Sequence, residues 1–235
     1  MKKVVCLVGL MILFSLGLTS VQAQNYDRLW KEVEELQKKD LPRSVIDAVN
    51  RIYDLARTEG NRPQMMKAWL VRADYRVALS RDSLQAERDS LLAWTETETD
   101  TVTRAILYSL LGNKVQDVFQ NNVDEAISYF HQSLRDVEVL GRTSARDFRP
   151  MTVSGRVSET YLQDNMFDLL VRRAIRSLSE EWLWTDAGKA ADVQKEILAL
   201  YDRLILFYEI DNRNRSGVLL TKLARLMYQR ERLTG

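Results

Sequence analysis

The sequence predicts an all-α protein in which antiparallel helical hairpins stack as a right-handed solenoid. Two observations apply to almost the whole chain. The 235 residues include only nine glycines and three prolines, and apolar residues recur every three or four positions. Because helices joined by short turns pack as antiparallel pairs, and such pairs stack on one another, this pattern favours a superhelix with a concave face.

The first 23 residues have the organisation of a secretory signal peptide. Lys2 and Lys3 precede an apolar run at residues 4–18, and a small-residue sequence follows at residues 21–23. The run is shorter than the roughly 20 residues of a typical membrane-spanning helix. We therefore expect cleavage after Ala23, export to the periplasm or cell envelope, and no transmembrane segment in the mature chain. The alternative is an uncleaved N-terminal anchor.

The mature chain, which we expect to begin at Gln24, has a nearly balanced charge. Removal of residues 1–23 takes away two of the 34 basic residues and none of the 33 acidic residues. No basic face or polybasic run predicts binding to nucleic acid or to an anionic membrane. Cys6 is the only cysteine and lies in the predicted signal, so the mature chain is expected to have no thiol, disulfide or cysteine metal ligand.

Residues 24–140 are predicted to form a helical, repeat-like first half. Asn25 is a candidate N-cap, Pro42 and Pro63 suit the first turns of two helices, and Gly60 suits the end of one. We interpret the polar, acidic run at residues 95–101 as a loop. The apolar stripes predict helices near residues 26–36, 45–56, 65–77, 83–94, 106–119 and 123–134.

Residues 141–163 are predicted to be an irregular connection, and residues 164–235 a helical second half. The connection contains Gly141, Pro150 and Gly155 and little periodicity, with a short extended piece expected at residues 151–153. Helical periodicity resumes at residues 166–178, 187–210 and 218–228. The last helix runs nearly to Gly235 without a closing cap, which is compatible with a truncated chain.

One helical pair follows the tetratricopeptide pattern of an aromatic residue, Leu-Gly, an apolar residue, and then Ala and an aromatic residue in the partner helix. Gly112 and Ala126 are small where the two helices are expected to cross. The turn between them is about two residues longer than the consensus repeat of roughly 34 residues allows. We therefore predict tetratricopeptide-like packing, not a regular array. The matching residues are Tyr108, Leu111, Gly112, Val115, Ala126 and Phe130.

No group of residues predicts catalysis, a cofactor or a metal ion. His131 is the only histidine and lies near Ser128 on a predicted helix, where a nucleophile would lack the strained turn and free backbone amides that hydrolases use. The acidic run at residues 95–101 lacks the glycine and closing glutamate of a calcium loop. The acidic pairs at residues 34–35 and 180–181 point in different directions on helices. We expect a protein that is not an enzyme.

Five residues are candidates for an interaction surface. Trp182 and Trp184 could form an aromatic platform, or could instead pack between two helices. Arg172, Arg173 and Arg176 flank an apolar stripe and could contact an acidic partner, or could simply be the solvated face of their helix.

Several segments, in this order, resemble the N-terminal region of large exported bacterial proteins of the alpha-2-macroglobulin family. None of them is a catalytic motif, so the resemblance rests on their order and spacing along most of the mature chain. The segments are residues 26–34, 38–45, 61–65, 129–134, 147–150 and 161–170.

The resemblance implies a non-catalytic helical scaffold that packs against the rest of a longer protein or against an envelope partner. In that family such a segment precedes β-sandwich domains, a bait region and often a Cys-x-x-Gln thioester, which together trap proteases. The mature chain has no cysteine for such a thioester, so the trapping activity belongs to the parent protein and the chain would be a fragment or truncated relative.

Two other functions remain open. One is a free-standing periplasmic tetratricopeptide-like adaptor that binds a peptide or protein, which a groove lined by Trp, Tyr and Arg would favour. An uncovered apolar flank near residues 201–228 would instead favour docking of a further domain. The other is a cell-wall enzyme, which would need two carboxylates facing into one deep pocket.

Overall fold

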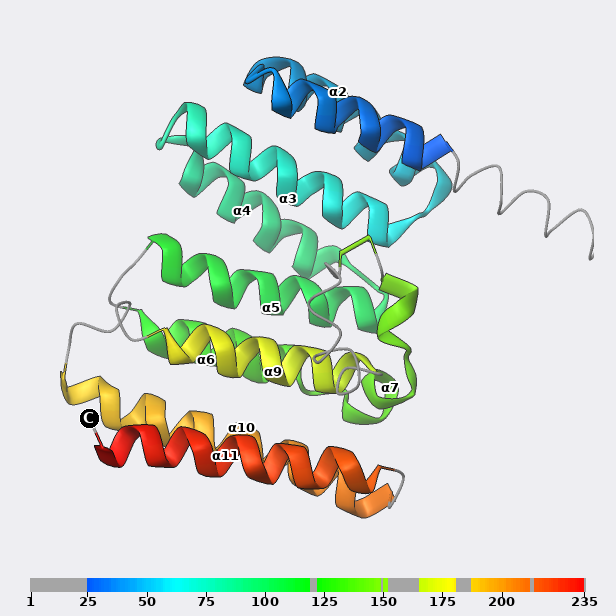
Figure 1. Ribbon diagram of the computed structural model, residues 1–235. Helices are drawn as coiled ribbons and strands as arrows, with labels where there is room; N and C mark the ends of the chain where they lie inside the picture. Colours follow the sequence, from blue (N-terminus) through cyan, green and yellow to red (C-terminus); the bar gives the residue numbers. More distant parts are fainter. Residues whose placement is uncertain are drawn as a thin grey trace, which may run out of the picture. The chain divides into compact units, whose positions relative to one another are not determined.

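The computed structural model describes residues 25–118, 122–148, 150–151, 165–180, 187–211 and 214–234, which form α-helices, one 3₁₀ helix and turns, with no strand among them (Figure 1). The prediction of an all-α protein is confirmed. The chain divides into two compact units, Met1–Leu84 and Gln85–Gly235. The predicted signal peptide lies outside the described residues. None of the helices described is long and apolar enough to cross a membrane.

The N-terminal unit contains a helix over residues 25–38, α2 (Pro42–Glu59) and α3 (Arg62–Leu79). Pro42 stands at the start of α2, where its missing amide hydrogen is not needed. Gly60 ends α2 with φ of 66°, a left-handed conformation that glycine adopts without strain. Asn61 then caps α3 by accepting a 3.3 Å hydrogen bond from the Gln64 backbone amide. The α2–α3 turn is thus encoded locally.

The apolar stripes of these three helices meet in one core. Two side chains from the N-terminal half of the first helix form hydrogen bonds to the hairpin: the Tyr26 hydroxyl donates to Glu59 Oε2 at 2.6 Å, and Trp30 Nε1 donates to Gln64 Oε1 at 2.7 Å. The buried core residues are Tyr26, Trp30, Val33, Val45, Ala48, Val49, Ile52, Ala56 and Ala68.

The C-terminal unit begins with α4 (Ser83–Thr97), which starts at the boundary between the units, and α5 (Thr101–Val118). The prediction of a loop over residues 95–101 is wrong at both ends. Thr95 is buried within α4, where its hydroxyl donates to the Leu91 carbonyl oxygen at 2.7 Å. Asp100 caps α5 by accepting a 2.8 Å hydrogen bond from the Thr103 amide. Only residues 98–100 lie outside the two helices.

α5 packs against α6 (Val123–Ser133) as a helical pair. The Phe130 ring lies directly on Gly112: a β-carbon placed on Gly112 would lie 2.7 Å from Phe130 Cε1. Gly112 is therefore needed for the close approach, as its place in the sequence pattern predicts, although the group that fills the space is the Phe130 ring. Tyr108 and Tyr129 stack across the same pair with ring centroids 6.2 Å apart.

The chain continues through α7 (Val137–Arg142) and a 3₁₀ helix, η1 (Ala145–Phe148), to α9 (Met166–Ser179). The first residues of the predicted connection are thus helical, and Thr152 and Val153 of the predicted extended piece lie outside the described residues. α9 packs against α5, α7 and α10 (Ala187–Asp211), and α10 packs against α11 (Arg215–Thr234).

Candidate functional site

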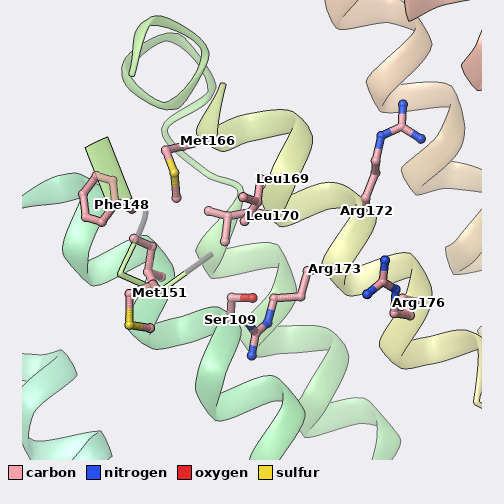
Figure 2. A pocket seen from close by; sticks show the side chains of 10 residues that line it. Ser109, Phe148, Met151, Met166, Leu169, Leu170, Arg172, Arg173 and Arg176 are labelled. Atoms are coloured by element: carbon pink, nitrogen blue, oxygen red, sulfur yellow. The ribbon is translucent and has the colours of Figure 1, made fainter. Parts of the chain in front are cut away.

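Three arginines of α9 lie around one cavity of about 250 Å³ in the C-terminal unit (Figure 2). Arg172, Arg173 and Arg176 were candidates for an interaction surface, and the structure places all three in its wall. Trp182 and Trp184 lie outside the described residues. The remaining walls come from α5, from the segment around η1 and from the first turn of α9, with Ile106, Ser109, Phe148, Met151, Met166, Leu169 and Leu170.

The first residues of α9 fix the orientation of the cavity wall that carries the three arginines. Asn165 caps the helix by accepting a 2.9 Å hydrogen bond from the Asp168 amide, and the Met166 amide donates to the Thr143 carbonyl oxygen at 3.0 Å. Residues three and four positions apart share a helix face, so Leu169, Arg172, Arg173 and Arg176 follow one another along the cavity side.

Arg172 belongs to a structural network. Its Nε donates to Asp168 Oδ1 at 2.6 Å, and its second guanidinium nitrogen donates to Thr221 Oγ1 of α11 at 3.1 Å. The fully buried Asp168 also accepts a 2.7 Å hydrogen bond from the Tyr208 hydroxyl of α10. Figure 2 shows the Arg172 guanidinium directed away from Ser109. Its charge is neutralised by Asp168, and it links α9 to α11.

Arg173 is different, because no carboxylate of the described residues forms an ion pair with it. Its side chain is largely buried and its Nε has no hydrogen-bond partner in the described structure. Burial lowers the pKa of the Arg173 guanidinium, and the positive charge of Arg176 lowers this pKa further. The guanidinium lies beside Ser109 in Figure 2.

Ser109 provides the second unsatisfied polar group of the cavity. It lies in the middle of α5, is fully buried, and its Oγ has no hydrogen-bond partner among the described residues. A buried hydroxyl without a partner is costly, so most buried hydroxyls are paired with protein or water. The cavity therefore combines a guanidinium and a hydroxyl, both capable of donating, with apolar side chains in the same walls. Sequence reasoning did not single out Ser109, since a lone serine inside an apolar helix carries no motif.

The other candidates do not assemble into a reactive site in the described structure. His131 Nε2 lies 2.9 Å from Glu196 Oε1 of α10, and the His131 side chain is half exposed. Ser128 is exposed one turn earlier on α6. No group of three His, Cys, Asp or Glu residues that could hold a metal ion occurs in the described part of the chain.

A second surface feature lies on the last two helices. Most of the large apolar side chains that are exposed in the described residues come from α10 and α11. We refer to them as the α10–α11 apolar face. Its members are Leu206, Ile210, Leu219, Leu220, Leu223, Leu226 and Met227.

Comparisons of this chain with family models, with curated proteins and with solved structures found no match.

Proposed function

We propose that this protein is a non-catalytic helical scaffold of the cell envelope that binds another protein domain through the α10–α11 apolar face. The observation behind the proposal is the exposure of that face, on which Ile210 is 74% and Leu219 is 68% exposed. Contiguous exposed apolar patches are rare on monomeric soluble proteins and mark interaction sites.

The pattern of α11 supports a docking surface. One side of this helix packs against its own unit through the buried Gly217, Thr221 and Tyr228. The leucines at positions 219, 223 and 226 recur at a spacing of three or four and lie outside that packed side. A helix that presents apolar residues on a second side has more apolar surface than its own hairpin can cover.

Charged side chains of α11 form ion pairs with carboxylates of α10. Lys222 Nζ lies 2.7 Å from Glu209 Oε1, and Arg225 Nε lies 2.7 Å from Asp202 Oδ1, so charged groups of α11 already have partners on α10. An incoming domain would therefore meet an apolar centre with a neutralised polar rim, which is the usual organisation of a protein interface.

The partner that we favour is the rest of a longer, exported polypeptide similar to the alpha-2-macroglobulin family. The ordered sequence resemblance supports this partner, and the uncovered flank is the feature expected for docking of a further domain. Protease trapping would then be an activity of the whole protein, with this segment as its helical support. In the same proposal the hairpins stack as a tetratricopeptide-like solenoid, and residues 1–23 direct export.

Photo-crosslinking in the native host tests this proposal. A photoreactive amino acid is placed at Leu223, and in a matched control at Leu79, which is about as exposed but lies on α3 of the N-terminal unit. We expect protein crosslinks from position 223 and not from position 79. Mass spectrometry then separates the hypotheses: crosslinked peptides encoded beyond Gly235 indicate the longer polypeptide, whereas peptides of another envelope protein indicate a free-standing adaptor. Equal or absent crosslinking at the two positions would refute the docking face.

A further inference from the structure

We propose that the cavity between α5, η1 and α9 binds a carboxylate carried on a short apolar chain, held by Arg173 and Ser109. The site is separate from the α10–α11 apolar face and does not depend on the function proposed for it.

The charge of Arg173 is the first step of the argument. A buried charged group is strongly disfavoured unless another charge pairs with it. Arg172 has such a partner in Asp168, at 2.6 Å, whereas Arg173 has no ion-pair partner in the described part of the chain. The charged neighbour that acts on Arg173 is Arg176, another cation. The positive charge of Arg173 at the cavity wall, which no described carboxylate balances, attracts an anion.

The geometry of the two donors is the second step. Arg173 projects from α9 and Ser109 from α5, two helices that pack together, and Figure 2 shows their side chains converging in the cavity. Arg173 Nε and Ser109 Oγ both lack hydrogen-bond partners in the described structure. A carboxylate accepts hydrogen bonds at two oxygens, so it can accept from the Arg173 guanidinium and from the Ser109 hydroxyl at the same time.

The apolar walls are the third step, because they restrict what can carry the carboxylate. Phe148, Met151, Met166 and Leu170 line the cavity together with the two donors. Methionine side chains adapt to irregular apolar ligands. A fully hydrated or multiply charged anion would lose its water against these walls, whereas a hydrocarbon chain would gain by burial.

The volume is the fourth step. The cavity holds about 250 Å³, less than the roughly 300–1,000 Å³ of sites for drug-sized ligands. This volume fits a carboxylate with a short hydrocarbon body. Two sources have this chemistry: a medium-chain fatty acid, and the C-terminal residue of a peptide that ends in leucine or a similar side chain.

Isothermal titration calorimetry on the purified, delipidated full chain tests the proposal and distinguishes the sources. The probes are decanoate and an N-acetylated tripeptide that ends in leucine with a free carboxylate. Decanol and the amidated tripeptide are the controls, because they keep the apolar body and lose the charge. We expect binding of one molecule per chain for one charged probe, which identifies the source, and no binding of its neutral control. Failure of both charged probes, or equal binding of a neutral control, would overturn the proposal.

Two substitutions assign the site. Arg173→Gln and Ser109→Ala are each expected to weaken binding of the carboxylate about tenfold or more, because each removes a hydrogen bond to a charged group, worth roughly 1.5–3 kcal/mol. Arg57→Gln is the matched control, since Arg57 is an exposed arginine on α2 of the N-terminal unit, and it should bind like the unmodified protein. Unchanged affinity in Arg173→Gln would contradict the assignment.

A stability measurement covers the case in which a variant changes the fold. Without ligand, Arg173→Gln should unfold at an equal or higher urea concentration than the unmodified chain, because it removes a largely buried charge that no carboxylate of the described residues pairs with. Added ligand should raise the urea midpoint of the unmodified chain and leave that of Arg173→Gln nearly unchanged. A lower midpoint for ligand-free Arg173→Gln would show that the guanidinium is a structural group and would refute the site.

Discussion

α2 in the N-terminal unit and α11 in the C-terminal unit place their apolar residues in opposite environments. Both helices have apolar side chains at spacings of three and four. Those of α2 form a core with the helix over residues 25–38 and with α3, and Ile52 is 0% exposed. On α11 the buried side is formed by Gly217, Thr221 and Tyr228, while Leu223 is 53% exposed.

The difference shows what helical periodicity can and cannot predict. A spacing of three and four residues predicts that a helix has an apolar side, because side chains at these separations lie on one face. It does not identify what covers that side, which depends on elements far away in the sequence or on another molecule. The last hairpin is held to α9 by apolar side chains of α10, such as Phe207 against Phe167, and by polar groups around Asp168. The leucines of α11 lie outside these contacts and remain available for a partner.

The largest loss of folding stability is expected on substitution of Asp168, the centre of those polar groups. Asp168→Ala removes the carboxylate that accepts from Arg172 of α9 and Tyr208 of α10, and so leaves the buried Arg172 guanidinium without its counter-charge. Breaking a buried pair in this way costs about 3–5 kcal/mol. Urea unfolding followed by circular dichroism measures the free energy of unfolding.

The control for Asp168 is Asp202→Ala, which removes the exposed carboxylate that pairs with Arg225. Exposed ion pairs contribute about 0–1 kcal/mol, so this variant should be nearly as stable as the unmodified chain. Similar losses in the two aspartate variants would show that the network around Asp168 does not hold the C-terminal hairpin.

Truncation of one apolar side chain on α2 and one on α11 compares these two helices directly. Ile52→Ala should lower the free energy of unfolding by about 2–5 kcal/mol, because it leaves a cavity in the core of the N-terminal unit. Leu223→Ala should change it by less than about 0.5 kcal/mol, because this side chain is already half exposed. Denaturant titrations of both variants check this. A loss above 1 kcal/mol for Leu223→Ala would mean that the α10–α11 apolar face is covered within the chain.

Gly112 tests how closely α5 and α6 pack. Gly112→Ala places a methyl group 2.7 Å from the buried Phe130 ring, so the ring or a helix must move. Overpacking of this kind costs about 1–3 kcal/mol. The thermal unfolding midpoint of Gly112→Ala should therefore fall, and the combination with Phe130→Leu should recover part of the loss through coupling between the two sites. Additive losses in the double variant would argue against contact between these residues.

Local signals account for most of the predicted helices. Pro42, Gly60 and Pro63 act on the backbone of their own turns, so they predict where α2 begins, where α2 ends and where α3 begins. The sequence predicts a loop at Thr95 because an alternating polar run begins there. The Thr95 hydroxyl donates to Leu91 inside the same helix, and this bond lets a threonine be buried in α4.

The candidate site was predictable only in part, because its members come from distant segments. The arginines of α9 form a cluster in the sequence, and the structure places them at one cavity. Arg172 is neutralised by Asp168, four positions earlier on the same helix, whereas its hydrogen bond to Thr221, 49 positions further on, depends on how α11 packs. Ser109 lies on another helix, so its position opposite Arg173 depends on how α5 and α9 pack, which no local pattern contains.

A smaller loss of stability than at Gly112 is expected at Tyr26, which anchors the first helix of the N-terminal unit. Its hydroxyl donates to the Glu59 carboxylate, and burial together with this bond raises the pKa of Tyr26 above its usual value. The folded state therefore keeps the tyrosine proton at a pH where the unfolded chain loses it. This contribution to stability is complete below about pH 10 and is lost as the pH rises through the folded pKa.

Tyr26→Phe should cost about 1 kcal/mol at neutral pH, the value of one hydrogen bond, and the difference from the unmodified chain should shrink above about pH 10. Urea unfolding at pH 7 and above pH 10 measures both values, and Tyr75→Phe on α3 is the control. A difference between the Tyr26 variant and the unmodified chain that stays constant across this range would mean that the Tyr26 proton is not held by Glu59.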